Sequence, residues 1–293
     1  MNMKILNMGS LNIDHVYHVK TIVKPGETIA SSKVEQACGG KGLNQSIALA
    51  KAGMTVCHGG MVGVDGEILI DALKSAGVST EKVKITNGQS GHTIIQVDEN
   101  AQNSIILFGG ANREITEEYI DLMLQDLEEG DLVLLQNEIS NLSYALDCAK
   151  EKKLQIIFNP SPMEDYLMTL DLSSVSLFFI NEIEGEQLTG EKMPEKILAS
   201  MSAKYPFSAV VLTYGARGAY FRKKQECYYQ EAYKVQALDT TAAGDTFTGY
   251  FVKEYFETGN VKRALQLAAK ASSIAVTRMG AASSIPIFEE VFI

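Results

Sequence analysis

Short apolar runs alternate along this chain with segments whose apolar residues recur at three- and four-residue intervals. Short runs of Val, Ile, Leu and Phe favour buried strands, whereas the longer period favours amphipathic helices. The pattern predicts strands at residues 4–8, 56–62, 132–135, 155–159, 177–180 and 209–213. It predicts helices at residues 43–52, 67–76, 116–127, 142–150 and 183–188.

This alternation predicts an α/β fold of three layers, in which helices cover both faces of a mostly parallel sheet. Ligands of such proteins bind at the carboxyl ends of the strands. The polar residues that directly follow the strands are therefore the candidates for a functional site.

Two stretches depart from the alternation and resemble antiparallel hairpins. One comprises residues 15–23 and 28–37 around a Pro25-Gly26 turn, and the other comprises residues 92–98 and 104–108. Because polar, glycine-containing loops flank both, we expect a small β lid over the strand ends, formed by about 12–38 and 90–110. The alternative is an extension of the main sheet. We expect one domain, 1–293, and no separate module.

Composition limits the partners and the compartment. The chain has 293 residues and a formal net charge of −10, without a Lys- or Arg-rich run, so it would repel nucleic acid. Its longest apolar run, residues 175–180, is far shorter than the roughly 20 residues of a membrane span. The four cysteines form no CxxC pair and the four histidines have no zinc-ligand spacing. We expect a cytoplasmic protein with reduced thiols and no membrane contact.

The segment DTTAAGDTFTGYF, from Asp239 to Phe251, carries the most specific chemistry. An apolar helical pattern follows Ala242, Ala243, Gly244 and Asp245, so these four residues should lie where a helix begins. Free backbone N–H groups and the helix dipole make such a start an anion site. A carboxylate beside a bound phosphate suggests a base that takes a proton from an attacking hydroxyl. The alternative is an ordinary acid in a first helical turn.

Further polar residues follow the other predicted strands. Residues 39–44, GGKGLN, place bare backbone, an ammonium and an amide at a helix start, but the spacing fits neither a Walker loop nor a dinucleotide-binding loop. Each of the other residues could be a turn former or a helix cap, yet together they suit hydrogen bonding to a polyhydroxylated ligand. They are Asn12, Asp14, Glu138, Asn181 and Glu184. The loop 213–218 is a further tight turn, or an ordinary hairpin.

The sequence resembles the ribokinase family of carbohydrate kinases, also called PfkB, along essentially its whole length. GGKGLNQ and DTTAAGDTFTGYF carry the resemblance, in the family's order. Three shorter segments support it: NPSP at 159–162, NEIE at 181–184 and VTRMGA at 276–281.

The resemblance implies a role for each matching position. Asp245 would be the base, with Ala242, Ala243 and Gly244 in the anion hole. The sugar pocket would comprise Asn12, Asp14, Gly40, Lys41, Gly42, Asn44, Glu138 and Asp245. The ATP site would comprise Asn181, Thr213, Gly215, Ala216, Arg217, Gly218 and Gly244. Glu184 would act on Mg²⁺ through water. A K⁺ site would use oxygens of Asp239, Thr241, Ala275, Arg278, Gly280 and Ser284.

The resemblance implies transfer of a phosphoryl group from ATP to the primary hydroxyl of a free sugar. Ribose is the favoured substrate. Phosphosugars would need more cations than Lys41, and Arg113 is the one candidate. Fructokinase, deoxyribokinase and nucleoside kinase remain alternatives; the last would stack a base on Tyr17 or Phe108. A non-catalytic sugar-binding regulator is another. Ala269 and Lys270 depart from the residues usual against adenine. Exposed lid edges predict a homodimer through the lid.

Overall fold

The computed structural model describes residues 3–100 and 102–292. Its main sheet has nine strands in the order β13-β12-β11-β10-β9-β8-β1-β4-β5, and every pair from β11 to β5 is parallel. These strands are β1 (Ile5–Met8), β4 (Val56–Val62), β5 (Ser79–Ile85), β8 (Leu132–Gln136), β9 (Gln155–Asn159), β10 (Val175–Asn181), β11 (Ala209–Thr213), β12 (Ala219–Lys223) and β13 (Glu226–Gln230).

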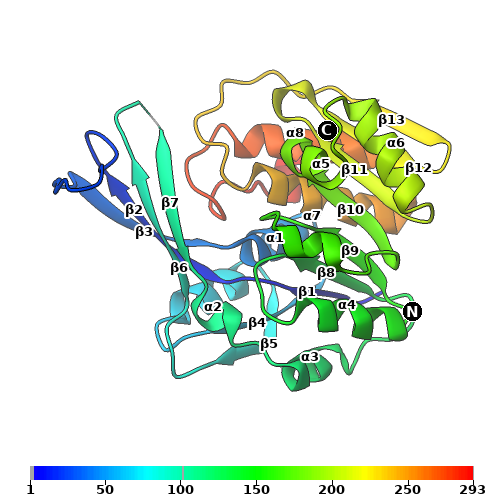
Figure 1. Cartoon of the computed structure of the whole chain (residues 1–293), viewed down its shortest axis with the longest axis horizontal. Helices are drawn as coiled ribbons and strands as arrows, with labels where there is room; N and C mark the ends of the chain where they lie inside the picture. Colours follow the sequence, from blue (N-terminus) through cyan, green and yellow to red (C-terminus); the bar gives the residue numbers. More distant parts are fainter. Residues whose placement is uncertain (1–2, 101, 293) are drawn as a thin grey trace.

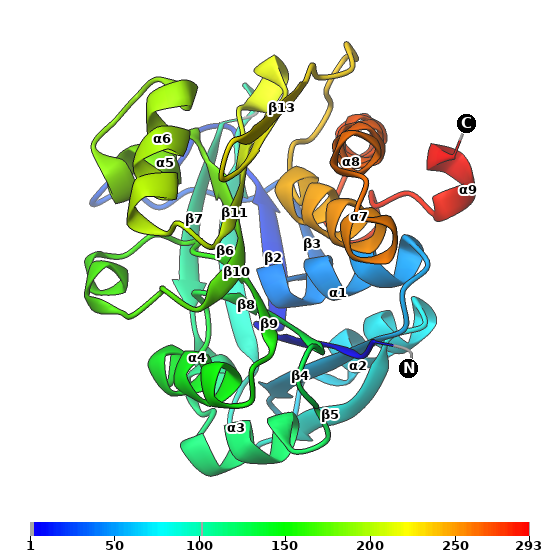
Figure 2. The same ribbon diagram turned by 90° about the vertical axis from the view of Figure 1, so that its right-hand side faces the viewer.

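Helices cover both faces of this sheet, as Figure 2 shows, which confirms the predicted α/β fold. One face carries α1 (Lys41–Lys51), α2 (Glu67–Ser75), α7 (Ala243–Thr258), α8 (Val261–Ala275) and the short α9 (Phe288–Val291). The opposite face carries α3 (Glu117–Leu124), α4 (Leu142–Glu151), α5 (Glu182–Thr189) and α6 (Pro194–Lys204). Single 3₁₀ turns are η1 (Gly110–Arg113), η2 (Asp165–Thr169) and η3 (Gly215–Arg217). Along the central strands, alternate side chains enter one of two cores, because neighbouring strand residues point to opposite faces.

A second sheet of four strands projects from one edge of the body (Figure 1). Its order is β3-β2-β6-β7, from β2 (Asn12–His18), β3 (Lys33–Gly39), β6 (Gly91–Val97) and β7 (Asn103–Phe108). Both hairpins are antiparallel, but β2 and β6 run parallel, so the sheet is mixed and not wholly antiparallel as predicted. Position 101 of the expected range lies outside the described residues.

Several elements have no counterpart among the predicted ones: β5, β12, β13, α6 and α8. In α8 the buried face is largely alanine, whose small side chains give a weaker apolar signal in the sequence than Leu, Ile or Val. Strand β5 has no residue classed as fully buried, which removes the apolar run by which the other strands were recognised.

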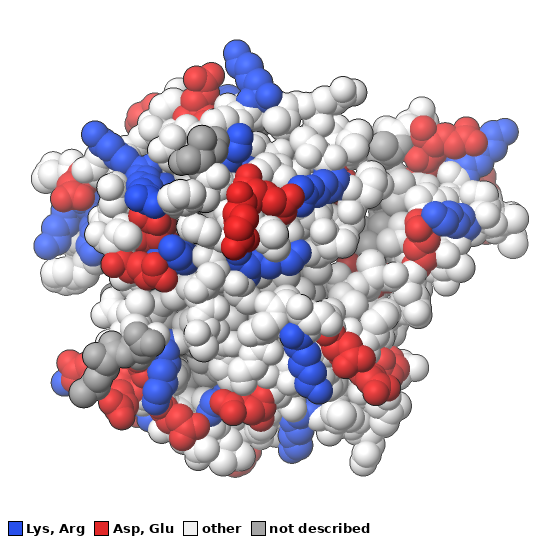
Figure 3. Space-filling model, turned by 180° about the vertical axis from the view of Figure 1, so that it is seen from behind, with Lys and Arg blue, Asp and Glu red and all other residues white. Residues whose placement is uncertain are grey.

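Two surface properties complete the description. No helix among the described residues is long and apolar enough to cross a membrane. Acidic and basic side chains are interspersed over the face shown in Figure 3, without a broad area of one sign.

Candidate active site

The start of α7 presents free backbone donors to open space. Its N-cap, Ala242, has a left-handed backbone with φ 58° and provides no side-chain cap. Within the described parts of the chain, nothing accepts a hydrogen bond from the N–H groups of Gly244 and Asp245. A Cβ placed on Gly244 would meet no atom within 4 Å. This geometry suits an anion, because the unpaired donors lie at the positive end of the helix dipole.

At two neighbouring helix starts, most N–H donors are already paired within the described residues. In α1 the N–H of Lys41 donates to Glu138 Oε2 at 3.0 Å, and that of Leu43 donates to the Ser10 carbonyl at 2.9 Å. In α5, Asn181 Oδ1 accepts from the N–H groups of Ile183 and Glu184, both at 2.9 Å. Among the described residues, the start of α1 has no free N–H group and that of α5 has only that of Glu182, whereas that of α7 has two adjacent ones, from Gly244 and Asp245.

Asp245 lies in this first turn of α7 and is 7% exposed. Its Oδ2 accepts from Asn44 Nδ2 at 3.1 Å, and its Oδ1 accepts from Gln45 Nε2 at 2.8 Å. Two amides of α1 therefore hold the carboxylate, one on each oxygen. The Asn44 Oδ1 is buried and has no partner among the described residues, so its hydrogen-bonding capacity is unused.

Close packing of α1 on α7 makes these bonds possible. Gly249 of α7 lies against α1, where an added Cβ would come within 2.5 Å of the Ala48 Cβ and 2.6 Å of its carbonyl carbon. Any larger residue at 249 would push the helices apart. Glycine at this position thus sets the distance from the α1 amides to Asp245.

Strand β2 places Asn12 and Asp14 at the junction of the two sheets. Asp14 Oδ1 accepts from Thr93 Oγ1 at 2.6 Å, and Asn12 Oδ1 accepts from Asn112 Nδ2 at 2.8 Å. Burial raises the pKa of the Asp14 carboxyl, the bond from Thr93 opposes that rise, and the nearby Glu138 adds to it. Both side chains therefore retain acceptor capacity at a partly desolvated position.

Lys41 and Glu138 lie beside the start of α1. Glu138 accepts from the Ser10 hydroxyl as well as from the Lys41 N–H, which fixes its carboxylate against the Gly40–Gly42 turn. Burial lowers the pKa of the Lys41 ammonium, but the carboxylates of Asp245, Glu138 and Glu184 outweigh it and the pKa is raised overall. The ammonium thus stays charged among three carboxylates.

Asn181 and Glu184 form a capping box at the start of α5, in which Glu184 Oε2 accepts from the Asn181 N–H at 3.0 Å. Burial raises the pKa of the Glu184 carboxyl, and Asp245 adds to that rise, although hydrogen bonds and Lys41 oppose it. The capping role of Asn181 and the candidate site role of Glu184 are compatible, because only one carboxylate oxygen is used by the box.

The loop 213–218 lies next to Asn181, because Thr213 pairs with Asn181 in the register of β10 and β11. Gly215 and Gly218 have φ 53° and 98°, and a Cβ on Gly218 would lie 2.1 Å from the Gln230 carbonyl oxygen. The Arg217 guanidinium stacks 3.8 Å from the Tyr214 ring centroid. Ala216 completes the turn η3.

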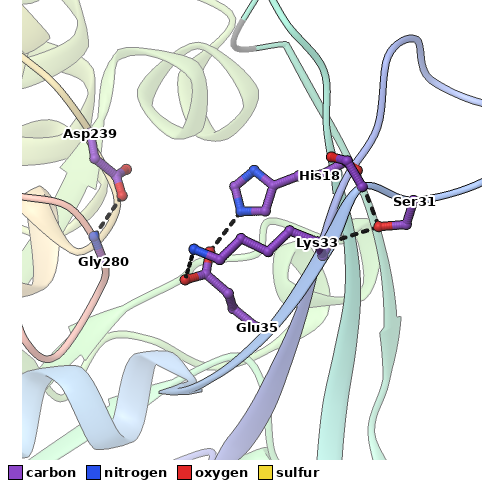
Figure 4. Close-up of polar contacts among 7 residues, drawn as sticks. His18, Ser31, Lys33, Glu35, Asp239 and Gly280 are labelled. Atoms are coloured by element: carbon purple, nitrogen blue, oxygen red, sulfur yellow. Dashed lines mark hydrogen bonds and ion pairs between the residues drawn. The ribbon is translucent and has the colours of Figure 1, made fainter.

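Figure 4 shows Asp239 joined to Gly280, so two distant loops meet near the start of α7. Asp239 Oδ2 accepts from the Gly280 N–H at 2.9 Å, and Oδ1 accepts from the Thr241 N–H and hydroxyl. Of the other residues in the expected K⁺ set, Ala275 accepts from the Arg278 N–H, while Ser284 is buried. The Arg278 side chain itself pairs with Glu290.

The same figure shows how the strands of the second sheet are tied together. His18 of β2 lies 2.7 Å from Glu35 of β3, and Glu35 also pairs with Lys33 at 2.7 Å. These contacts are exposed, so they contribute little to stability.

The remaining candidates are Arg113, Phe108, Ala269 and Lys270, of which Arg113 lies close to Glu138 because it contacts the carbonyl of Ile139. Arg113 has an exposed side chain whose Nη1 lies 3.4 Å from the Ile139 carbonyl oxygen. Phe108 is 51% exposed at the end of β7 and packs against His92. Ala269 is buried in the core, and Lys270 lies over the Tyr233 ring. Among the described residues, no group of three or more His, Cys, Asp or Glu side chains could hold a metal ion on its own.

Sequence reasoning missed several polar partners of the site. Gln45 directly follows Asn44, and polar residues inside otherwise apolar strands were the available signal for Asn7 and Gln136. Ser10, Thr93 and Asn112 had no comparable signal, since their partners come from distant segments. The missed residues are Asn7, Ser10, Gln45, Thr93, Asn112 and Gln136.

Comparison with known proteins gives a consistent result. The family model described as pfkB family carbohydrate kinase matches residues 2–287. The ribokinase of Haemophilus influenzae is 34% identical over 97% of this chain and 95% of its own length. The deoxyribokinase of Salmonella typhi is 32% identical over 98% of this chain and 97% of its own length.

Among solved structures, an Arabidopsis thaliana ribokinase complexed with ribose and ATP superposes with a TM-score of 0.86. It is 28% identical, and the match covers 99% of this chain and 98% of that one. The chain belongs to the pfkB family of carbohydrate kinases.

Proposed function

We propose that this protein transfers the γ-phosphoryl group of ATP to the primary hydroxyl of free D-ribose, giving D-ribose 5-phosphate and ADP. The observation that carries the proposal is the start of α7, where free N–H groups lie beside a carboxylate held by two amides. A phosphoryl acceptor site needs both features together, an anion hole and a base.

Polar groups that match a sugar's hydroxyls surround Asp245. Asn44 offers its unpartnered Oδ1, and Asp14 and Asn12 offer acceptors at the edge of the second sheet. The proposed pocket comprises Asn12, Asp14, Gly40, Lys41, Gly42, Asn44, Glu138 and Asp245. It is rich in acceptors, which favours a neutral polyol over a phosphosugar.

In the proposed reaction, Asp245 takes the proton of the sugar hydroxyl as its oxygen bonds to the γ-phosphorus. The bond from that phosphorus to the β–γ bridging oxygen breaks, and ADP leaves. The N–H groups of Gly244 and Asp245 and the Lys41 ammonium meet the charge on the phosphoryl oxygens. The protein thus contributes position and charge, and no covalent intermediate forms.

The nucleotide would lie along the ends of β10 and β11, with the loop 213–218 and Asn181 beside its phosphates and Gly244 under the γ-phosphate. Thr213 and Asn181 are paired across the adjacent strands β11 and β10, which supports a continuous nucleotide site there. Gly215 leaves its backbone open, because an added Cβ would meet only Glu182 Oε1 at 3.9 Å. The Arabidopsis ribokinase structure is a complex with ribose and ATP, which supports ATP as the nucleotide.

Magnesium fits the acidic side of the site. Burial and Asp245 both act to raise the pKa of Glu184, so the negative charge of its carboxylate is not fully balanced by nearby donors and cations. One of its oxygens also lies outside the capping box. A divalent cation held through water would supply that compensation and neutralise the phosphates of ATP. Glu184 would orient the metal's water ligands.

Potassium fits the loops joined by Asp239. The N–H groups of Leu238 and Asp239 donate to the Val276 carbonyl, and the Gly280 N–H donates to Asp239. The loops around residues 239 and 280 are therefore already in contact. Oxygens of Asp239, Thr241, Ala275, Arg278, Gly280 and Ser284 would hold the cation. Its effect would be to order the segment that leads into Ala242, without contact to substrate.

The four-stranded sheet would act as a lid over the sugar and would pair with a second copy. Apolar side chains of this sheet remain exposed, among them Ile105, Ile106 and Leu107 at 56%, 62% and 45%. Strand β7 is also an edge strand with unpaired backbone groups. A homodimer through the lid would cover both features.

Deoxyribose is the second candidate substrate, because the Salmonella typhi deoxyribokinase is nearly as similar as the ribokinases. The test is ADP release over a panel of pentoses, hexoses, their phosphates and adenosine, with and without K⁺. We expect the highest kcat/KM for ribose and a higher rate with K⁺. Preference for deoxyribose, a phosphosugar or adenosine, or sugar binding without ADP release, would contradict the proposal.

A further inference from the structure

A chain of buried polar side chains leads from Asp245 into the core beneath α1. Gln45 Nε2 donates to Asp245 Oδ1, and Gln45 Oε1 accepts from Gln136 Nε2, both at 2.8 Å. Gln136 Nε2 also donates to Asn7 Oδ1 at 2.8 Å. Gln45, Gln136 and Asn7 are each 0% exposed. Water therefore does not compete for these bonds.

The far end of the chain is also fixed. Asn7 Nδ2 donates to the Gly42 carbonyl at 2.8 Å and to Ser46 Oγ at 2.9 Å. Ser46 Oγ in turn lies 2.8 Å from His58 Nδ1. Complete burial lowers the pKa of His58 to about 4, so this ring is neutral at neutral pH. All members between Asp245 and His58 are then uncharged.

Each amide in the chain has only one workable orientation. Rotating the Gln45 amide by half a turn would place its oxygen against the Asp245 carboxylate and its NH₂ against that of Gln136. Both new contacts would be repulsive and buried. The orientation of Gln136 is fixed in the same way by Asn7. This series of hydrogen bonds therefore fixes the orientation in which Gln45 donates to Asp245.

Stability alone gives a poor reason for this arrangement. The Gln136 Oε1 is buried without a partner among the described residues, and burying such an acceptor costs folding free energy. Apolar side chains on β1 and β8 would fill the same space without that cost. A role in the reaction offers a reason for keeping the amides.

We propose that Gln45 is a positioning residue for Asp245, and that Gln136 and Asn7 hold Gln45 in place. The inference rests on the proposed role of Asp245 as the base. Asn44 alone would leave the carboxylate free to rotate about its bond to Cβ, whereas a second donor on Oδ1 fixes the plane of the group. A base must direct a lone pair at the hydroxyl, and small misplacements cost up to about 100-fold in rate.

The test is a double-mutant cycle on kcat with Gln45→Met, made in the native chain and in the Asp245→Asn background. Met keeps the volume of Gln but cannot donate to Asp245. We expect kcat to fall about 10-fold in the native chain, with KM for sugar and ATP changed less than about 2-fold. In the Asp245→Asn background we expect a further loss of less than about 2-fold, since the group to be positioned is gone.

A structural role would give a different pattern, with the same fractional loss in both backgrounds. That result, or a change confined to KM, would overturn the proposal. Should Gln45→Met fail to fold, Gln136→Met decides by the same criterion. Ser208→Ala is the control, because Ser208 is buried and hydrogen-bonded far from the site, at the start of β11. It should lower the free energy of unfolding without changing kcat.

The cycle also separates this inference from the proposed function. A native rate in Asp245→Asn would remove Asp245 as the base, and Gln45 would then have nothing to position. A large loss in Asp245→Asn together with a background-independent effect of Gln45→Met would leave the base in place and overturn only the positioning role.

Discussion

At the scale of single residues, the account depends on how Asp245 is held. Its carboxylate is nearly buried, faces free N–H groups of its own helix and accepts one bond on each oxygen. An acid in a first helical turn is common for electrostatic reasons alone. Two amide donors from another helix are not explained by that preference, and they favour a reactive role.

Asp245→Asn therefore tests the base directly. The change keeps the shape of the side chain but removes the proton acceptor, so we expect kcat to fall by about 10²–10⁴. The dissociation constant for ATP, measured by calorimetry, should stay within a few-fold. A variant with unchanged turnover would show that another group takes the proton.

Asp14→Asn should separate binding from stability. Burial and Glu138 raise the pKa of Asp14, so its ionised form costs folding free energy above the ordinary pKa of 3.8. Removing the charge should increase the free energy of unfolding at neutral pH by on the order of 1 kcal/mol, and the gain should disappear below that pKa. The same variant should raise the KM for ribose about 10-fold or more.

The measurements are chemical denaturation at pH 7 and pH 3, and initial rates against ribose and ATP. Equal loss of affinity for both ligands would mean that Asp14 only supports the fold. Thr93→Val is a matched control, because it removes the bond to Asp14 without touching its charge.

At the scale of elements, the starts of α1, α5 and α7 distinguish three uses of one geometry. Ser10 and Glu138 pair the donors of α1, Asn181 pairs two of those of α5, and α7 leaves two adjacent N–H groups free among the described residues. The sequence pattern predicted the start of α7 and the strand ends because both depend on local order along the chain. It could not predict Ser10, Gln45 or Thr93 as partners, because their contacts arise only when distant strands and helices pack.

The second sheet illustrates the same limit. Alternation within residues 92–98 and 104–108 predicted the β6–β7 hairpin, since hairpins are local. The parallel pairing of β2 with β6 joins segments about 80 residues apart in the sequence. It depends on where the main sheet places the two strands, and no local sequence pattern indicates this. For the same reason, the junction that places Asp14 beside Thr93 could not be predicted.

The buried polar layer between β4 and α1 predicts a specific pH dependence of stability. His58 has a folded pKa of about 4 against 6.5 in the unfolded chain. As pH falls from 6.5 to 4, the unfolded state gains a proton that the folded state does not. The free energy of unfolding should therefore fall by about 3 kcal/mol over this window, and the decline from this group should end near pH 4.

Urea denaturation of the native chain and of His58→Met, at intervals of pH between 7 and 4, measures this contribution. The difference between the two curves should change across the window by about the amount given. A difference that is constant with pH would show that His58 has the same pKa in the folded and unfolded states.

At the scale of the whole molecule, the body and the second sheet meet along β1, β2 and α1, where the sugar pocket is proposed. The strands of the second sheet project beyond the body (Figure 1), and apolar side chains of β7 are exposed. In the proposed dimer, a second copy that packs its own four-stranded sheet against this one would remove that exposure and complete the sheet edges.

Ile106→Lys should weaken such a dimer, because it places a charge on the exposed strand β7. We expect light scattering to give a dimer mass for the native chain and an increased monomer fraction for the variant. Phe207→Lys is the matched control, because Phe207 is 78% exposed in the loop between α6 and β11 and does not belong to the second sheet. It should leave the mass unchanged. A native chain that is monomeric at assay concentration would exclude the dimer.

The central claim is that the open start of α7 receives the terminal phosphoryl group beside Asp245. A crystal structure with ribose and a non-hydrolysable ATP analogue measures this directly. The account predicts that oxygens of the terminal phosphate accept hydrogen bonds from the N–H groups of Gly244 and Asp245, with the primary hydroxyl of ribose hydrogen-bonded to the Asp245 carboxylate. A terminal phosphate bound away from these two N–H groups would contradict it.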